Sequence, residues 1–204
     1  MTIRIHKNDL PDLAAYAGAV AIDTEALGLN PHRDRLCLVQ LSPGDGTVDI
    51  VQIAKDAAPA PNLIALLGDS GRTKIFHFAR FDVALLYRTF GVMAGPIFCT
   101  KIASRLTRTY TDRHGLKDLV REFLDIEMSK QQQSSDWAAA TLSEAQIAYA
   151  ASDVLYLHRL KAELDRRLDR DGRRELAEAC FGFLPTRARL DLAGWPDEDI
   201  FAHI

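Results

Sequence analysis

The chain has 204 residues, of which 48% are hydrophobic and 26% are charged, and its formal net charge is −3. This length and composition predict one well-packed domain and exclude a disordered or fibrous protein. No apolar run reaches the roughly 20 residues of a membrane-spanning helix, and the first residues lack the apolar core of a signal peptide, so we expect a cytoplasmic protein without membrane contact. The net charge argues against bulk electrostatic capture of nucleic acid. The three cysteines form no CxxC pair and predict buried free thiols: Cys37, Cys99 and Cys180.

Strands joined by short connections are predicted in the first part of the chain. A short strand at 3–6 precedes the compact apolar run 19–23, which is typical of a strand covered on both faces. The runs Leu36–Ser42 and 47–53 follow, and the segment Pro-Gly-Asp-Gly between them has the residues favoured in hairpin turns. We therefore expect the sheet to begin with antiparallel strands.

Helices alternate with short strands in the rest of the chain. The pattern predicts a helix at 61–70, a strand at 73–78, a helix at 81–91, a strand at 96–99, and helices at Thr100–Thr107 and Leu116–Leu124. The polar segment 128–137 is typical of a loop. A helical pattern then runs from a capping box at Ser143 until Gly172 interrupts it, a last helix covers 173–184, and the tail shows no periodicity. These elements predict an α/β domain with a mixed sheet.

Two carboxylates separated by one threonine end the predicted strand 19–23. Alternate side chains of a strand share a face, so Asp23 and Glu25 are expected to project the same way. Like charges side by side cost free energy unless a positive charge lies between them. The simpler alternative is that both carboxylates reach solvent at the end of the strand, and this short pattern alone does not decide between the two.

Further acids stand at the start of one predicted helix and within another. Asp82 follows an apolar strand, and it could either join Asp23 and Glu25 or only complement the helix dipole. Tyr149 and Asp153 are four residues apart in a helical pattern, so both can point into one cleft, although a surface pair would have the same spacing.

Together these residues resemble the DEDD superfamily of 3′→5′ exonucleases, in the subgroup whose third motif is Tyr-x-x-x-Asp. Asp23-Thr-Glu25 matches the first motif, His77-Phe-Ala-Arg-Phe-Asp82 resembles the second, and Tyr149-Ala-Ala-Ser-Asp153 matches the third. The segments "SKQQQSSDW" and "QIAYAASDVLYLHRL" are similar to the loop and third-motif helix of ribonuclease D proteins. Within that group the resemblance is strongest to the short alphaproteobacterial nano-RNase C type. It includes "LGLNPHRDRL", "FCTKIASRLTRTYTDRHGL" and "GWPDEDIFAH".

The chain departs from full-length ribonuclease D in two ways. It leaves no room for the helical nucleic-acid-binding domains that follow the catalytic domain, and Cys99-Thr100 stands where many relatives have Asp-Thr. Both departures favour short oligonucleotides over structured RNA as the substrate. The resemblance implies a single exonuclease domain over 1–204 with a ribonuclease-H-like mixed β-sheet flanked by helices, the DnaQ-like exonuclease fold.

The resemblance also implies a catalytic set composed of four acids and one tyrosine, namely Asp23, Glu25, Asp82, Tyr149 and Asp153. Carboxylate oxygens suit hard cations, so we expect two divalent metal ions, Mg²⁺ or Mn²⁺, with the four acids as ligands and Asp23 bridging both. Tyr149 has an ordinary pKa of about 10 and is a poor base near neutral pH. We expect it to orient the attacking water, and the sequence leaves open whether it also accepts a proton.

For the substrate, the resemblance implies a 3′-terminal nucleotide beside the backbone of Thr24, Ala26 and Leu27. The other candidate contacts are residues that could wedge against a base, stack on one or neutralise phosphate: Leu27, Leu29, Phe81, Trp137, His77 and Lys130. The leucines and aromatic residues could instead belong to the core, and His77 could be a hydrogen-bonded core histidine.

A basic segment offers further phosphate contacts. It contains one acid, Asp112, against five basic residues: Lys101, Arg105, Arg108, Arg113 and Lys117. The segment could face phosphates or could be a solvated helix face, and both alternatives stay open.

The expected function is metal-dependent 3′→5′ hydrolysis of short oligoribonucleotides, down to dinucleotides, with release of nucleoside 5′-monophosphates. The alternatives are a broader exonuclease acting on longer RNA or DNA ends and a catalytically silent nucleic-acid-binding module. The last helix and tail, about 173–204, carry apolar side chains beyond what one small domain must bury and predict subunit contacts. The resemblance implies a ring-like homo-oligomer, an octamer.

Overall fold

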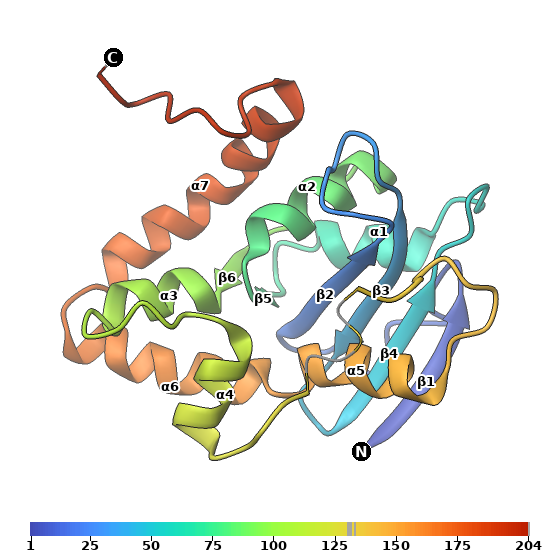
Figure 1. Cartoon of the computed structure of the whole chain (residues 1–204), viewed down its shortest axis with the longest axis horizontal. Coiled ribbons are helices and arrows are strands. Elements are labelled where there is room, and N and C mark those ends of the chain that lie inside the picture. The colour runs from blue at the N-terminus through green and yellow to red at the C-terminus, as the bar shows by residue number, and fades with distance from the viewer. Residues whose placement is uncertain (130–131, 133, 204) are drawn as a thin grey trace.

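The computed structural model describes residues 1–129, 132 and 134–203, which form a mixed sheet flanked by helices (Figure 1). The strands are β1 (Thr2–Lys7), β2 (Val20–Ala26), β3 (Leu36–Ser42), β4 (Thr47–Gln52), β5 (Lys74–Phe76) and β6 (Ile97–Cys99). Their order across the sheet is β1-β4-β3-β2-β5-β6. Strands β2, β3 and β4 run antiparallel to their neighbours in this set, while β1 pairs parallel with β4 and β5 pairs parallel with β2 and β6. The predicted antiparallel start and mixed sheet are confirmed.

The helices are α1 (Pro61–Gly68), α2 (Ala79–Phe90), α3 (Thr100–Thr107), α4 (Leu116–Leu124), α5 (Glu144–Leu155), α6 (Leu157–Arg170) and α7 (Arg174–Ala193). Helix α5 lies across one face of β2, β3 and β4, and α1 passes behind these strands (Figure 1). Helices α3, α6 and α7 pack against one another beyond the β5–β6 edge. None of the described helices is long and apolar enough to cross a bilayer.

The long helix predicted from Ser143 is wrong in one respect, because it is broken at Tyr156 into α5 and α6. Tyr156 has φ −102° and ψ −6°, outside the usual helical values. Helix α5 packs on the sheet, whereas α6 packs mainly on α3, α4 and α7. The break at Tyr156 thus lies where the packing changes from the sheet to the neighbouring helices, and no local sequence signal shows this change.

The last helix extends beyond the predicted end at 184 and continues through Pro185 to Ala193. A proline inside a helix costs about 3 kcal/mol, so tertiary contacts must stabilise this part. Asp191, which is buried, accepts hydrogen bonds from Arg80 Nε at 2.6 Å and Arg187 Nη2 at 2.5 Å. The Arg80–Asp191 ion pair fastens the end of α7 to the start of α2, and the Arg187–Asp191 pair lies within α7. Only the residues after Gly194 match the predicted irregular tail.

The cysteine prediction is partly wrong. All three thiols are free, and Cys37 and Cys99 are buried, but Cys180 on the surface of α7 is only partly buried. Helix α7 packs against α2, β6, α3 and α6, and the Cys180 thiol lines a groove between α3 and α7.

Candidate active site

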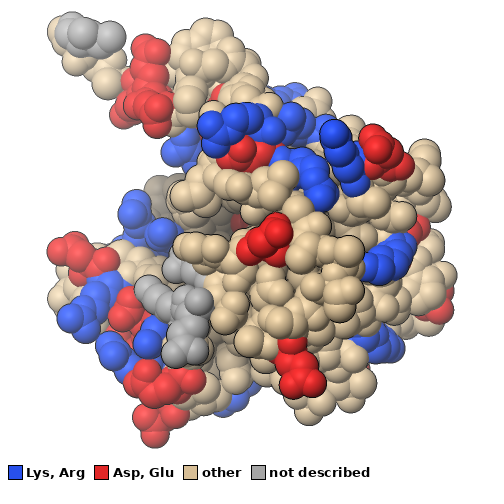
Figure 2. Space-filling model, turned by 45° about the vertical axis from the view of Figure 1, so that its right-hand side comes forward, with Lys and Arg blue, Asp and Glu red and all other residues tan. Residues whose placement is uncertain are grey.

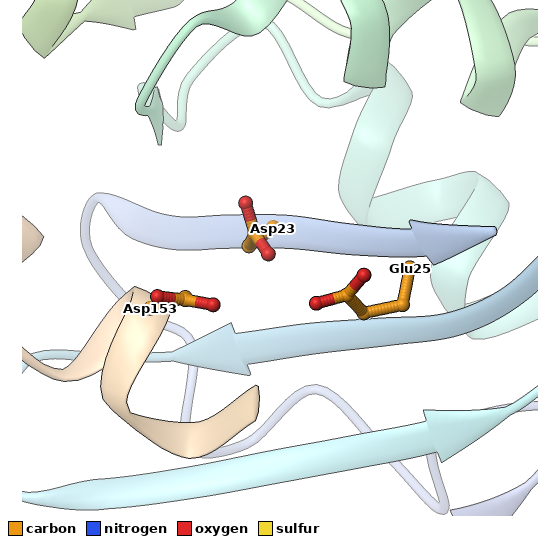
Figure 3. A group of neighbouring side chains, drawn as sticks. All are labelled: Asp23, Glu25 and Asp153. Carbon is orange, nitrogen blue, oxygen red and sulfur yellow. The ribbon is translucent and has the colours of Figure 1, made fainter. Parts of the chain in front are cut away.

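Three carboxylates converge on one face of the sheet. Asp23 and Glu25 project from β2, and Asp153 comes from α5, which crosses the same face (Figure 3). One carboxylate oxygen from each residue lies within 4.8 Å of the others. Strand β2 continues to Ala26, so both of its acids belong to the regular strand and share a face by alternation. The register shifts between Glu25 and Ala26, a bulge that redirects the chain just beyond the acids.

The surrounding protein makes these carboxyl groups difficult to ionise together. Burial raises the pKa of Asp23 to about 7. Burial, followed by the charges of Asp23, Asp153 and Asp82, raises the pKa of Glu25 to about 9. Burial and the charge of Asp23 also raise the pKa values of Asp153 and Asp82, both well above the ordinary range of an aspartate. The donor set is therefore suited to a hard divalent cation, which supplies the positive charge that the acids lack.

Asp82 approaches Asp23 from the other side of β2. It belongs to the first turn of α2 and is 4% exposed, and its Oδ1 accepts a hydrogen bond from Thr24 Oγ1 at 2.6 Å. Thr24 faces away from Asp23 and Glu25, because side chains alternate along a strand. The threonine between the two acids thus positions a third acid, in addition to spacing the first two.

Tyr149 lies one turn before Asp153 on α5 and donates a hydrogen bond to it. Burial and the nearby charges of Asp153, Glu25 and Asp23 raise the tyrosine pKa above its ordinary value of 10, so the hydroxyl remains protonated. The Trp137 ring packs against the Tyr149 ring, with centroids 5.9 Å apart. Trp137 is 3% exposed, which matches the alternative of a core residue rather than a stacking face for a base.

The other expected substrate contacts near β2 differ in exposure. Leu27 and Leu29 are 54% and 88% exposed just beyond the acids, so both are accessible to a ligand. Ala26 is partly buried, and the Thr24 hydroxyl is already bonded to Asp82. Phe81 is partly buried and packs against the core, which matches the alternative reading of it as a core residue.

His77 is held beside the second-motif helix. Its Nδ1 lies 2.9 Å from Thr100 Oγ1, and the Thr100 hydroxyl bonds to the Phe76 carbonyl at 3.2 Å. Because that hydroxyl donates to the carbonyl, it accepts from His77 Nδ1–H. Burial and the charge of Lys101 lower the pKa of His77 to about 3, so the ring is neutral. The bond to Thr100 matches the alternative of a hydrogen-bonded histidine, and the partly exposed ring leaves a substrate contact open. Lys130 lies outside the described residues.

The basic segment does not act as one continuous strip. Arg108 is 1% exposed, pairs with Glu122 and donates from Nη1 to Ser104 Oγ at 3.0 Å, so it fits neither alternative, the phosphate-facing strip or the solvated helix face. It is a structural arginine that joins α3 to α4. Arg105 and Arg113 are exposed and Lys101 is partly exposed. On the face drawn in Figure 2, acidic and basic side chains are interspersed, so no field of one sign covers that face.

A comparison with known families covers the segment that contains all three motifs. Residues 6–169, most of the chain, match a family model described as "3′-5′ exonuclease". The chain belongs to this 3′-5′ exonuclease family. The expected DnaQ-like exonuclease fold and the resemblance to ribonuclease D are confirmed.

Relatives and solved structures agree with this assignment. Ribonuclease D of Gluconacetobacter diazotrophicus is 38% identical over 154 residues, which are 76% of this exonuclease chain and 39% of the relative. The chain thus spans about two fifths of the length of such curated relatives. The structure of Brucella melitensis NrnC with bound Mg²⁺ is 66% identical with a TM-score of 0.96, and NrnC bound to pGG is 67% identical with a TM-score of 0.97. Both comparisons cover 100% of each chain.

Two further features of the structure have little or no signal in the sequence. Gln40 is fully buried on β3 directly opposite Asp23, and the only sequence signal is a lone amide within the apolar run Leu36–Ser42. Arg80 of the second motif pairs with Asp191, 111 residues away, and no local pattern could predict that partner. The surroundings of both residues depend on contacts between segments that are distant in the sequence.

The carboxylate cluster predicts that the metal-free protein loses stability as pH rises. The folded-state pKa values of about 7 for Asp23 and about 9 for Glu25 exceed the ordinary values of 3.8 and 4.5, so the folded chain binds more protons than the unfolded chain between them. The free energy of unfolding should therefore fall from about pH 4 to about pH 9. Thermal unfolding with EDTA and with Mg²⁺ measures this, and the increase in Tm caused by Mg²⁺ should grow with pH. A Tm increment that shrinks between pH 6 and pH 9 would contradict the assignment of this cluster.

Proposed function

We propose that this chain is a metal-dependent 3′→5′ exoribonuclease that degrades short oligoribonucleotides, down to dinucleotides, to nucleoside 5′-monophosphates. The observation that carries the proposal is the convergence of Asp23, Glu25 and Asp153 within 4.8 Å, with Asp82 beside them. A catalytically silent binding module would have no physical need for four carboxyl groups whose pKa values are all raised. The pGG bound to NrnC, a relative that matches the whole chain, supports a dinucleotide as substrate.

The proposed mechanism uses two divalent cations, Mg²⁺ or Mn²⁺. Asp23, Glu25 and Asp153 would hold one ion, and Asp23 with Asp82 would hold the other. When bound, such ions lower the pKa of a water and stabilise the leaving oxygen of a phosphodiester. The Tyr149 hydroxyl, which stays protonated, acts as a hydrogen-bond donor that orients the attacking water and the Asp153 carboxylate. Thr24 holds Asp82 in place from the opposite face of β2.

The proposed substrate contacts lie immediately beyond β2. The 3′-terminal nucleotide would lie along the backbone of 24–27, with exposed Leu27 or Leu29 against the base. Arg105 and Lys101 at the surface of α3 would neutralise phosphate, as would Lys130. His77, neutral and partly exposed, offers its second ring nitrogen as an acceptor for a hydroxyl group.

A length series tests the proposal. RNA oligonucleotides from the dinucleotide to about a twenty-mer, and the matching DNA series, are compared by kcat/KM with Mg²⁺ or Mn²⁺. We expect the RNA dinucleotide to have the highest kcat/KM and the longer RNAs to have a kcat/KM lower by about tenfold or more. If kcat/KM rises with RNA length, or if it is equal for RNA and DNA of the same length, the broader exonuclease is favoured. No nucleotide release with any divalent metal would favour the silent module.

The tail and α7 support self-association, which we also propose. The tail projects from the end of α7 (Figure 1), and its Trp195, Ile200 and Phe201 are 43%, 44% and 76% exposed. An apolar groove between α3 and α7 lies nearby, lined in part by Ile102 and Phe183. A second copy would cover these surfaces, and a closed ring, an octamer, would restrict access of long substrates. Light scattering measures the molar mass, and a mass of one chain would contradict this proposal.

A further inference from the structure

The Gln40 side chain is an unpartnered amide in the interior of the sheet. It is 0% exposed, and neither its Nε2 nor its Oε1 has a hydrogen-bond partner among the described residues. Strand β3 is buried along its whole length, and its neighbours Val39 and Leu41 are apolar. A buried amide without partners destabilises the folded state, and an apolar side chain of the same size would pack there at lower cost. Packing alone therefore does not explain a glutamine at this position.

The strand register places Gln40 next to the carboxylate cluster. Asp23 of β2 and Gln40 of β3 are directly opposite each other, and directly opposed residues of antiparallel strands project to the same face. Their Cβ atoms are then about 5 Å apart, within reach of a glutamine amide and a carboxylate. Helix α5, which carries Asp153, packs over the same strands. On its other side Gln40 is paired with Ile50, which offers no polar side-chain group.

We propose that Gln40 is a positioning residue whose side-chain amide donates a hydrogen bond to the Asp23 carboxylate when the cluster holds its divalent cation. Carboxylates that bind a metal are themselves commonly hydrogen-bonded, and these outer contacts fix the direction of the metal-binding oxygen. An ionised Asp23 carboxylate has no hydrogen to donate and can only accept hydrogen bonds. The Gln40 Nε2 group supplies two donor hydrogens. The Gln40 amide thus lowers the stability of the cation-free chain. With the cations bound, it orients Asp23, the acid that both proposed cation sites share.

Replacing Gln40 with methionine separates these two effects, because methionine has nearly the same length and no amide. We expect the Tm of Gln40→Met in EDTA to equal or exceed that of the wild type, since the unpartnered amide is gone. We expect its Kd for Mn²⁺, measured by calorimetry, to be at least about tenfold weaker. A lower Tm in EDTA with an unchanged Kd would overturn the proposal and indicate a structural hydrogen bond through buried water. An unchanged Tm with an unchanged Kd would overturn it too.

Gln52 provides the matched control in the same sheet. It belongs to β4, is opposite Leu38, and already has partners, since its Oε1 accepts from Lys7 and its Nε2 donates to the Ala139 carbonyl at 3.4 Å. Gln52→Met should leave the Kd for Mn²⁺ within about twofold of the wild type, whatever its Tm. An equal loss of affinity in both variants would overturn a specific role for Gln40.

The inference rests on the proposed metal-dependent function, and the measurements distinguish the two. A wild-type chain that binds neither Mn²⁺ nor Mg²⁺ would contradict the proposed function itself. Wild-type binding that Gln40→Met reproduces would contradict only the role of Gln40. A crystal structure with Mg²⁺ gives a direct test that needs no variant: Gln40 Nε2 should lie within about 3.2 Å of an Asp23 carboxylate oxygen. A longer separation would overturn the proposal.

Discussion

Asp23→Asn should lower kcat/KM on an RNA dinucleotide by at least about 10³-fold and leave the fold intact. Asp23 lies at the centre of the cluster, because its charge acts on Glu25, Asp82 and Asp153 alike. Asparagine keeps the shape of the side chain but loses the negative charge that holds a cation, and loss of a central electrostatic contact of this kind costs several kcal/mol in the transition state. Nucleotide release measured by chromatography over a range of Mg²⁺ concentrations checks this expectation.

The same variant should be no less stable than the wild type in EDTA at pH 8.5. Burial raises the pKa of Asp23 to about 7, so above that pH the wild type carries a partly buried, uncompensated charge that asparagine removes. At pH 5, where Asp23 is protonated, the difference in Tm should disappear. Asp112→Asn is the matched control, since Asp112 is exposed, and it should change neither activity nor Tm. Activity of Asp23→Asn within tenfold of the wild type would remove Asp23 from the catalytic set.

The central part of the sheet could be predicted from sequence because its signals are local. The apolar runs before Asp23 and around Gln40, with a glycine-containing turn after Ser42, define strands through composition alone. The break at Tyr156 and the continuation of α7 past Pro185 could not be predicted in this way. Both depend on which surface each helix packs against, and helix propensity at the residue itself contains no such information.

The acids of the site could be predicted because their residue type and spacing can be read directly from the sequence. The residues that contact and position these acids could not be predicted. The pairs Asp23/Glu25 and Tyr149/Asp153 follow from the periods of a strand and a helix. The Thr24–Asp82 hydrogen bond joins residues 58 positions apart. Trp137 could have been a stacking face for a base or a core residue, and its burial against Tyr149 favours the core. Exposure is a property of the whole fold, so residue type alone overestimates the number of substrate contacts.

Tyr149→Phe should lower kcat by about 10²-fold with little change in KM. The hydroxyl donates to Asp153, and positioned groups that orient or exchange a proton with a reacting water contribute about 10² to 10⁴ in rate. Phenylalanine keeps the ring that packs against Trp137, so the Tm in EDTA should stay close to that of the wild type. Steady-state kinetics with a dinucleotide substrate, compared with Tyr156→Phe as a control outside the carboxylate cluster, measures the effect of the hydroxyl alone.

The pH dependence of the wild type decides whether that hydroxyl is a base or a donor. Because burial and three neighbouring carboxylates raise its pKa above 10, Tyr149 should remain protonated across the working range. The plot of log kcat against pH should then contain no rise that has an apparent pKa between 9 and 10 in the wild type and is absent in Tyr149→Phe. Such a rise would assign proton acceptance to the tyrosine. Near-normal turnover of Tyr149→Phe would instead remove the hydroxyl from the reaction and leave the orientation of the attacking water to the carboxylates and their cations.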